Sequence, residues 1–322
     1  MKIRRVLGLT LACVLATTSP LFGWGNEGHM MVAYTAYQKL APAAKKRVGV
    51  LLKLNPDYKN GKWTKMIPTG TAAKYRPMMI FMIAATWPDQ IKSEAGYSED
   101  GPDPHGNRPD GASSSQNTGY TDHLRHRYWH FLDKPFTQDG TSLAAFSVPT
   151  PNAETQIAAF RAVLASSDPD ALKSYDLVWL LHLIGDIHQP LHASTRVTAA
   201  EHDGDNGGNN VKLCGSPCKS KTALHGFWDD LPGTNKNPSV AVTAGKKLPK
   251  PDSTLADDTD TSDWIKESFE AAQNSVYVSP IEADDGPFTL TAAYKASARK
   301  LASERVALAG ARLANMINNE LK

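Results

Sequence analysis

Histidine and aspartate recur at a spacing of four residues, and this spacing is the feature of the sequence that most directly suggests chemistry. His182 and Asp186 form one pair, and His225 and Asp229 form a second. Residues four apart project from one face of a helix, so each pair could bind a common ion. Imidazole and carboxylate are ligands that suit zinc. With His192 between them, the two pairs offer more ligands than a single metal site requires. We therefore predict a cluster of several metal ions.

Either pair taken alone could instead be an ion pair on a helix surface. The surroundings of both pairs are apolar, because Trp179-Leu180-Leu181 precedes the first pair and Phe227-Trp228 lies within the second. Buried ionisable groups are unfavourable unless they are paired or bound to metal. The two pairs together therefore favour a metal centre.

The elements that must position these side chains are predicted to be helices. Apolar residues recur at spacings of three and four, whereas alternating runs typical of strands are few. The segments with the helical pattern are 28–40, 43–53, 71–87, 153–166, 170–189, 262–277 and 291–320. The helix that carries His182 is expected to end near Gln189, because Pro190 disfavours helical geometry in the residue before it.

The fold class is predicted to be mainly α, a single helical domain with long surface loops. Polar stretches rich in Gly and Pro lie at 93–119, 197–220 and 231–261. The histidine-containing segments lie on both sides of each stretch and would have to meet, so no stretch divides the chain. A chain of 322 residues can bury a sizeable core without disulfides.

The N-terminus has the pattern of a secretory signal, with three basic residues among the first five and an apolar run at 6–16. This run is too short to span a bilayer, and no later stretch approaches the ~20 apolar residues required. We expect residues 1–23 to be removed between Gly23 and Trp24. Lipidation at Cys13 is a weaker alternative.

Removal of the signal also changes the charge. The full chain has 35 Lys and Arg against 33 Asp and Glu, a formal net charge of +2. Without three cations of the signal the balance is 32 against 33, or −1. A chain of this charge lacks the broad basic surface by which duplex-DNA binders displace counterions, although local contact with nucleic acid remains open.

Two cysteines, Cys214 and Cys218, remain after the signal is removed. In an oxidising compartment we expect a local disulfide between them. The alternative, a zinc hook, would need two further ligands nearby and a reducing environment.

Six motifs in order along the chain resemble those of the S1/P1 nucleases, a zinc-dependent family related to bacterial zinc phospholipase C. They are Trp24-Gly25-x-x-Gly28-His29, Thr86-Trp87-Pro88-Asp89-x-x-Lys92, Trp129-His130-Phe131-Leu132-Asp133, His182-x-x-Gly185-Asp186-x-His188-Gln189-Pro190-Leu191-His192, Asp205-Asn206-Gly207-Gly208-Asn209 and Leu224-His225-x-x-Trp228-Asp229. The resemblance covers nearly all of residues 24–322. It implies one domain with the helical fold of phospholipase C and P1 nuclease.

By this resemblance the chain would bind three zinc ions. The first would be held by Asp89, His130, His182 and Asp186. Asp186 would bridge to the second, which would also take His29 and the free amino nitrogen and carbonyl oxygen of Trp24. The third would be held by His192, His225 and Asp229.

The resemblance also implies the reaction, which is hydrolysis of single-stranded DNA and RNA to 5′-phosphorylated products, with 3′-nucleotidase activity expected as well. A metal-activated hydroxide would form near neutral pH at the two bridged zincs, and the third zinc would stabilise the departing 3′-oxygen. The catalytic residues would be Asp89, Asp186 and Lys92, with Lys92 pairing with a phosphate oxygen.

Four residues are expected to bind substrate. Besides Lys92, Asp133 would accept hydrogen bonds from a base edge, Phe131 would stack on the base, and Asn209 would orient the substrate or the ligands. Stacking requires an unstacked base, so single strands would be preferred. The plain alternatives are core packing for Phe131 and a solvated surface position for Lys92.

Other histidines receive structural interpretations. His188 points away from the His182 face, so we expect it to pack or to support a ligand. His105, His123, His126 and His202 lie in polar loops and are expected to be solvated.

The main alternative activity is that of a zinc phospholipase C. The last ligand motif of that relative is His-x3-Glu, whereas this chain has His225-x3-Asp229. A non-catalytic zinc-stabilised protein is disfavoured, because structural zinc usually has four protein ligands and the set His192, His225 and Asp229 offers three.

The Asn237-Pro-Ser triplet is disqualified for glycosylation by its proline, and with one cysteine pair the chain resembles a bacterial exported enzyme, periplasmic or secreted. We expect a monomer without a stable protein partner.

Overall fold

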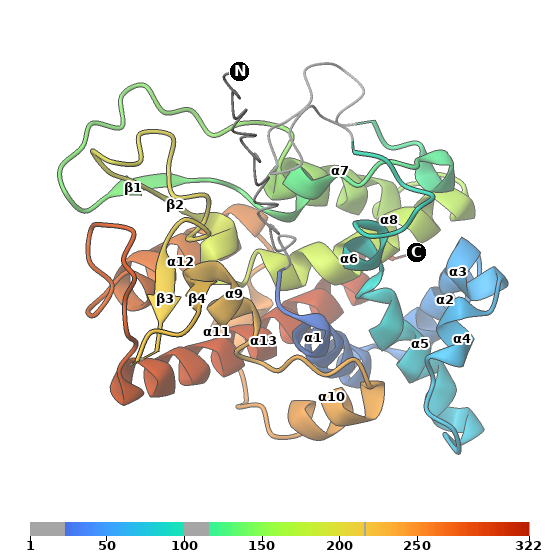
Figure 1. The fold of residues 1–322 in the computed structure, drawn as a ribbon. Coiled ribbons are helices and arrows are strands. Elements are labelled where there is room, and N and C mark those ends of the chain that lie inside the picture. Colours follow the sequence, from blue (N-terminus) through green and yellow to red (C-terminus); the bar gives the residue numbers. More distant parts are fainter. Residues whose placement is uncertain (1–22, 100–115, 216, 322) are drawn as a thin grey trace, which may run out of the picture.

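The computed structural model describes residues 23–99, 116–215 and 217–321. In this part of the chain the regular structure is mainly α-helical, as predicted (Figure 1). Nearly all of the expected signal segment, with Cys13, lies outside the described residues, and so does His105. No helix among the described residues is both long and apolar enough to span a membrane.

The elements follow one another along the chain with short 3₁₀ turns between some of them. The helices are α1 (Asn26–Lys39), α2 (Pro42–Leu52), α3 (Pro56–Lys59), α4 (Lys62–Lys65), α5 (Arg76–Ala84), α6 (Trp87–Ile91), α7 (Ala153–Ala165), α8 (Asp170–Asp186), α9 (Leu224–Asp229), α10 (Pro238–Gly245), α11 (Ser253–Asp257), α12 (Thr261–Ala271) and α13 (Ala292–Glu320). Strands β1 (Pro135–Thr137) and β2 (Thr195–Val197) pair in parallel, and β3 (Lys212–Cys214) and β4 (Lys221–Ala223) pair antiparallel.

Helix α8 lies in the core of the protein. It is buried on all sides from Lys173 to Asp186, as expected for a helix that is apolar around its whole circumference. Helices α1, α2, α7 and α13 contact it, and α1 also packs against α10 and α13 (Figure 1). The ionisable side chains of α8 from Lys173 to Asp186 are therefore shielded from bulk water, and they must find partners inside the protein.

The longest helix, α13, confirms the apolar stripe predicted near the C-terminus. Val306, Leu313 and Ile317 are fully buried. The helix begins at the capping residue Thr291, whose side chain accepts a hydrogen bond from the Tyr294 backbone N–H. Its buried face packs against α1, which carries one of the predicted metal ligands.

The boundaries differ from prediction in two segments. The segment 71–87 is divided into a 3₁₀ turn, α5 and α6, with Pro77 and Pro88 in the first turns of the two helices. The segment 231–261, predicted to be a loop, contains α10 and α11. Both helices begin beside a capping side chain, Asn237 or Asp252, and both are too short for an apolar period to show.

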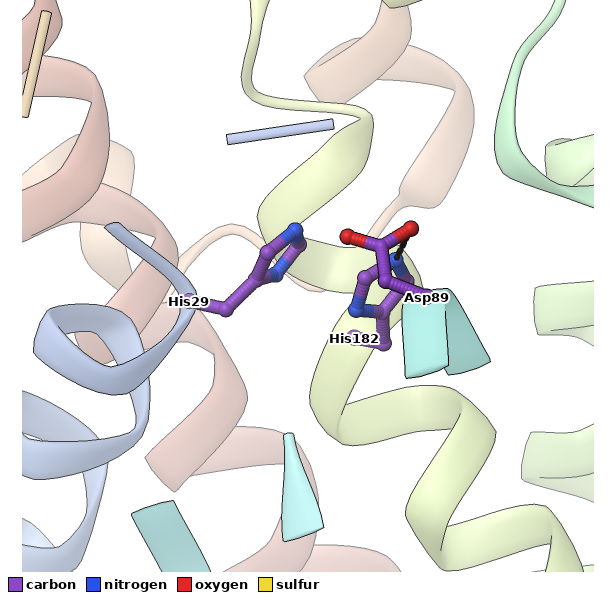
Figure 2. A group of neighbouring side chains, drawn as sticks. All are labelled: His29, Asp89 and His182. Atoms are coloured by element: carbon purple, nitrogen blue, oxygen red, sulfur yellow. Dashed lines mark ion pairs between the residues drawn. The ribbon is translucent and has the colours of Figure 1, made fainter. Parts of the chain in front are cut away.

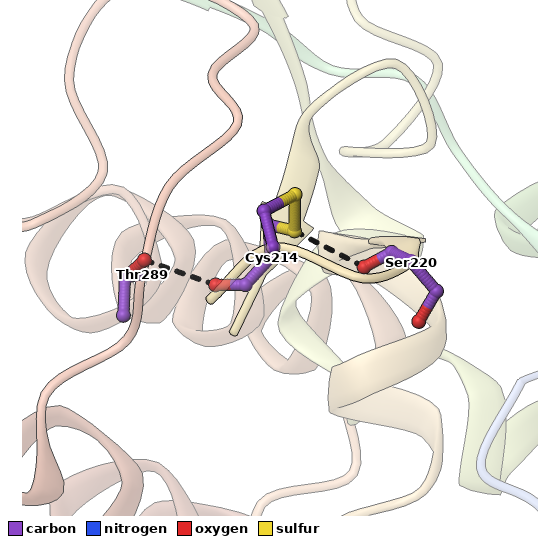
Figure 3. The surroundings of a disulfide bond; sticks show 4 residues. Cys214, Ser220 and Thr289 are labelled. Atoms are coloured by element: carbon purple, nitrogen blue, oxygen red, sulfur yellow. Dashed lines mark hydrogen bonds between the residues drawn. A yellow bond between two sulfur atoms is a disulfide. The ribbon is translucent and has the colours of Figure 1, made fainter. Parts of the chain in front are cut away.

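Cys214 and Cys218 form the disulfide expected from the sequence (Figure 3). Cys214 ends β3, and its backbone carbonyl accepts a 3.0 Å hydrogen bond from the Thr289 hydroxyl. The Ser220 carbonyl lies 3.2 Å from the Cys214 Sγ. The disulfide thus closes the β3–β4 hairpin.

Candidate metal centre

The predicted side-chain ligands come from distant parts of the chain and meet in the interior. Five of them, which we call the double cluster, are His29, Asp89, His130, His182 and Asp186. Three more, which we call the third ligand set, are His192, His225 and Asp229. Every one of these side chains is at least nine-tenths buried. In each of three subsets, His29/Asp89/His182, His130/His182/Asp186 and the third ligand set, the ligand atoms lie within 4.8 Å of one another.

Helix α8 positions the centre of the double cluster. His182 and Asp186 lie on one face of α8, with 3.1 Å between His182 Nε2 and Asp186 Oδ2, as the spacing of four predicted. His182 Nδ1 donates to the Ala85 carbonyl at 2.8 Å, which turns Nε2 toward the carboxylates. Figure 2 shows His29 from α1, Asp89 from α6 and His182 from α8 converging, with Asp89 Oδ1 3.5 Å from His182 Nε2.

Asp186 lies between two groups of histidines. Its Oδ1 is 3.3 Å from His29 Nε2, whereas its Oδ2 is 2.9 Å from His130 Nδ1. Asp186 Oδ1 and both His29 ring nitrogens are buried without a hydrogen-bond partner. Native proteins rarely leave such atoms unsatisfied, so the donor set fits bound cations on both sides of Asp186.

Burial and neighbouring charges set the protonation of the double cluster. Burial lowers the pKa of His29 and of His130, which favours the neutral imidazole that a metal requires. Burial acts in the same direction on His182, but the charges of Asp186 and Asp89 outweigh it and raise its pKa to about 9. Asp186 is also desolvated, yet the His182 charge holds the Asp186 pKa well below its usual range. Asp186 is therefore ionised, and cations bound on either side of it would each meet a charged carboxylate oxygen.

The third ligand set is oriented by backbone carbonyls. His192 Nδ1 donates to the His130 carbonyl at 2.8 Å, and His225 Nδ1 donates to the Gly207 carbonyl at 2.7 Å. The two Nε2 atoms are therefore directed toward each other at 3.1 Å, and Asp229 Oδ2 lies 3.5 Å from His225 Nε2. Burial raises the pKa of Asp229 well above its usual value.

The glycine-rich loop at 203–209 supplies the Gly207 carbonyl that orients His225. Gly207 has φ +57°, and a Cβ at this position would lie 2.7 Å from the Leu191 carbonyl, so only glycine fits. Asp205 anchors the loop by accepting hydrogen bonds from the Gly208 N–H at 3.0 Å and the Tyr277 hydroxyl at 2.7 Å.

The chain around Trp24 passes beside the double cluster. Trp24 is fully buried, and the N–H of Gly25 donates to the Asp229 carbonyl at 2.9 Å. A Cβ added to Gly23 would overlap Asp186 Oδ1 and lie 3.1 Å from His29 Nε2. The backbone on the N-terminal side of Trp24 therefore lies at the position of the predicted second metal. Binding of the Trp24 amine stays a prediction.

Of the predicted substrate residues, Lys92 lies directly at the cluster. Its ammonium is 2.8 Å from Asp89 Oδ1, and the residue is 2% exposed, so the solvated alternative is wrong. Phe131 is 8% exposed and belongs to the main core, while Asp133 is half-buried. Asn209 donates to the Asn206 carbonyl at 2.8 Å. The substrate roles of Phe131, Asp133 and Asn209 stay predictions.

The remaining histidines differ in part from expectation. His188 is buried away from the ligands, with Nδ1 donating to the Ile184 carbonyl, which is a packing role as predicted. His123 and His202 are exposed as predicted. The solvated position predicted for His126 is wrong, because this side chain is fully buried, stacks on Trp129 and lies 2.6 Å from Asp122 Oδ2.

One residue that contacts a candidate ligand was not predicted at all. Gln189 is fully buried, and its Nε2 lies 2.8 Å from Asp229 Oδ1. Its place within the His182–His192 motif was the available signal, but spacing along the chain does not show which side chain faces α9.

A helical fold that gathers eight buried His and Asp side chains into adjacent groups defines a protein with a candidate multinuclear metal centre. The chain belongs to the S1/P1 nuclease family, whose model matches residues 24–322, so the family expected from the six motifs is confirmed. The members of this family are nucleases, which are hydrolases.

Three curated relatives from Arabidopsis thaliana share parts of the sequence. Endonuclease 2 is 25% identical over 224 residues, which is 70% of this chain and 61% of the relative. Endonuclease 1 is 26% identical over 236 residues, or 70% of this chain and 57% of the relative. Endonuclease 4 is 38% identical over 71 residues, or 21% of each chain. The chain thus spans about three fifths of the length of the first two relatives.

Proposed function

We propose that the protein is a zinc-dependent phosphodiesterase that hydrolyses single-stranded DNA and RNA, as an endonuclease and a 3′-nucleotidase, to 5′-phosphorylated products. The observation that carries this proposal is the position of Asp186. Its Oδ1 faces His29, whereas its Oδ2 faces His130 and His182. Family membership and the names of the Arabidopsis relatives support the choice of nucleic acid as substrate.

Zinc fits the donors of the centre, which are imidazole nitrogens and carboxylate oxygens. Asp89, His130, His182 and Asp186 would hold the first ion, Asp186, His29 and Trp24 the second, and the third ligand set the third. When bound, zinc lowers the pKa of water and stabilises negative charge on phosphate oxygens. The third ligand set has three members, which leaves a position open for substrate.

Several residues of the chain act directly on a phosphodiester in this proposal. The Lys92 ammonium lies at the edge of the double cluster and would pair with a phosphate oxygen as negative charge increases in the transition state. Because Lys92 is almost completely buried, its charge acts through a medium of low dielectric, where it is stronger than in water. Phe131 would stack on the base, Asp133 would accept hydrogen bonds from its edge, and Asn209 would orient the substrate or the ligands. Stacking requires an unstacked base and therefore a single strand.

We further propose that the protein is exported, periplasmic or secreted, from a bacterial source, and acts as a monomer without a stable protein partner. The basic and apolar residues before residue 17 support export. Cleavage after Gly23 would free the Trp24 amine beside His29 and Asp186, and the close approach of Gly23 to both side chains supports this site of cleavage.

The test uses the chain that begins at Trp24, its Asp186→Asn variant and an Asp263→Asn control, in which an exposed aspartate of α12 is changed. We expect close to three zinc ions and release of 5′-nucleotides from single-stranded DNA and RNA. Asp186→Asn should lose at least one zinc and more than about 100-fold in activity, because residues that merely support ligands already contribute 10–100-fold. Asp263→Asn should match the unchanged chain.

Three results would contradict the proposal. They are full activity of Asp186→Asn, a zinc-free active protein, and release of phosphocholine from lecithin in the absence of nucleotide release. The last result would identify a phospholipase C instead.

A further inference from the structure

Gln189 occupies the junction between the two metal-binding regions. It follows α8 by three residues and precedes the 3₁₀ turn Pro190–Ala193, which carries His192. Its side chain is fully buried and spans to α9, where its Nε2 lies 2.8 Å from Asp229 Oδ1. Gln189 therefore connects the segment that follows Asp186 with the helix that carries Asp229.

The orientation of the Gln189 amide is fixed by its two partners. Its Oε1 accepts a 2.6 Å hydrogen bond from the Leu191 backbone N–H, which can only donate. The opposite end of the amide must then be the NH₂ group, and it faces the Asp229 carboxylate, which accepts when ionised. A flipped amide would place oxygen against oxygen at Asp229 and nitrogen against the Leu191 N–H.

Because of this hydrogen bond, the two Asp229 oxygens have different partners. Oδ1 is taken by Gln189, while Oδ2 faces His225 Nε2 at 3.5 Å. The bond also limits rotation of the carboxylate about its Cβ–Cγ bond, so that Oδ2 stays directed at His225, while Oδ1 lies 4.0 Å from His192 Nε2. Each member of the third ligand set then has one orienting hydrogen bond: His192 to the His130 carbonyl, His225 to the Gly207 carbonyl, and Asp229 from Gln189.

A neutral donor is the suitable chemical group for this position. Asp229 is 6% exposed, and an isolated buried carboxylate is strongly unfavourable. Lys or Arg here would stabilise the carboxylate, but its positive charge would repel an incoming cation. An amide N–H binds the carboxylate without placing a positive charge beside the proposed cation site.

We propose that Gln189 is the positioning residue of the third zinc site, holding the Asp229 carboxylate in the orientation that it needs beside His192 and His225 through the Nε2–Oδ1 hydrogen bond. The inference rests on the proposed zinc-dependent function. Gln189 acts through Asp229 and does not touch the metal or the substrate.

The experiment measures zinc affinity in the chain that begins at Trp24, by competition with chelators of graded strength, together with the total zinc count. Gln189→Met removes both hydrogen bonds at similar volume. Gln189→Glu keeps the acceptor for the Leu191 N–H and removes only the donor to Asp229. Gln156→Met is the matched control, because Gln156 is 2% exposed and its Nε2 has no hydrogen-bond partner.

We expect one of the three zinc affinities, that of the third site, to fall by about 10–100-fold in both Gln189 variants, as is usual when a residue supporting a metal ligand is removed. The other two zinc ions should bind as in the unchanged chain, which also shows that the variants are folded. Gln156→Met should change none of the three affinities.

Several outcomes overturn the inference. If Gln189→Glu retains or exceeds the original affinity while Gln189→Met loses it, the Leu191 contact is responsible and the donor to Asp229 is not. If all three affinities fall together, Gln189 supports the fold in general. If the unchanged chain binds only two zinc ions, the proposed function fails first, whereas three ions with unchanged affinities in every variant contradict only the role of Gln189.

Discussion

At the scale of single residues, buried carboxylates fall into two kinds in this protein. Asp89 and Asp186 are held ionised by Lys92 and the histidines, in the form that binds metal. Asp176 of α8 is the second kind, because the partner that lowers its pKa is the neutral amide of Asn117 rather than a cation. Burial raises the pKa of Asp176 to about 8, although hydrogen bonds from Asn117 at 2.7 and 2.8 Å to its two oxygens act in the opposite direction.

Asp176→Asn should therefore stabilise the protein at alkaline pH. The folded Asp176 keeps its proton up to pH ~8, whereas the unfolded residue loses its proton above pH ~4, so stability falls as the pH rises between these values. Asparagine removes this loss, and rotation of the Asn117 amide would bring its Oδ1, which is buried without a hydrogen-bond partner, to the new NH₂ group. We expect a gain of ~1–3 kcal/mol at pH ~9 and little gain at pH ~4, measured by urea unfolding. An equal gain at both pH values would contradict the assignment.

The candidate ligands could be predicted from the sequence because their types and local spacing carry the signal. His182 and Asp186 share a helix face wherever α8 lies. The burial of His126 could not be predicted, because it depends on a left-handed backbone turn at this residue, with φ +45°, and on the side of Trp129 that it stacks against. A polar neighbourhood in the sequence does not show which side chains are turned inward.

At the scale of elements, α12 and α13 hold the end of α8 in place. The Ser268 hydroxyl of α12 donates to the Ile187 carbonyl at 2.5 Å, and the Arg305 Nε of α13 donates to the His188 carbonyl at 3.2 Å. Arg305 and Arg312 are both buried, and Glu267 of α12 pairs with each of them at 2.8 and 2.7 Å. The segment between Asp186 and His192 is therefore fixed from behind by two helices.

Glu267→Gln should destabilise the fold substantially. It removes the carboxylate shared by two buried guanidinium groups, of which Arg312 keeps a second ion pair with Asp258 at 3.5 Å. Leaving a buried charge uncompensated costs about 3–5 kcal/mol in a fully buried pair. Because the Glu267 side chain is 24% exposed, we expect ~2–4 kcal/mol, measured as the free energy of unfolding. Glu304→Gln on α13, which breaks an exposed pair with Lys300, is the control and should cost less than ~0.5 kcal/mol. Equal effects would show that burial of the pair is irrelevant.

The helices that cross the core could be predicted because an apolar period repeats over several turns, as in α7, α8 and α13. Helices α3, α4 and α11 have four or five residues and show no period. The register of β1 against β2 could not be predicted either, since it pairs Phe136 with Arg196 across a long stretch of chain. Such pairing is decided by tertiary packing, and three-residue strands carry no alternation of their own.

At the scale of the whole molecule, the centre depends on both ends of the chain. Helix α1 carries His29 and packs along α13, while the Gly25 N–H binds the Asp229 carbonyl of α9. Side chains from α1, α6, α8 and α9 thus converge only when the complete domain has folded. We expect zinc binding and global folding to be thermodynamically coupled.

The chain that keeps Gly23 ahead of Trp24 should differ from the chain that begins at Trp24. Its Trp24 nitrogen is an amide rather than an amine, and the Gly23 backbone lies against Asp186 Oδ1 and close to His29 Nε2, where the predicted second zinc would bind. We expect the extended chain to bind one zinc fewer and to lose more than about tenfold in nuclease activity, because metal activation of water requires the complete site.

Metal analysis and hydrolysis of single-stranded DNA, before and after enzymatic removal of the extension, provide the measurement. Recovery on removal serves as the control, since the same molecules are compared. Three zinc ions and undiminished activity in the extended chain would mean that the free Trp24 amine is dispensable, and the second site would then have to be completed by ligands other than Trp24.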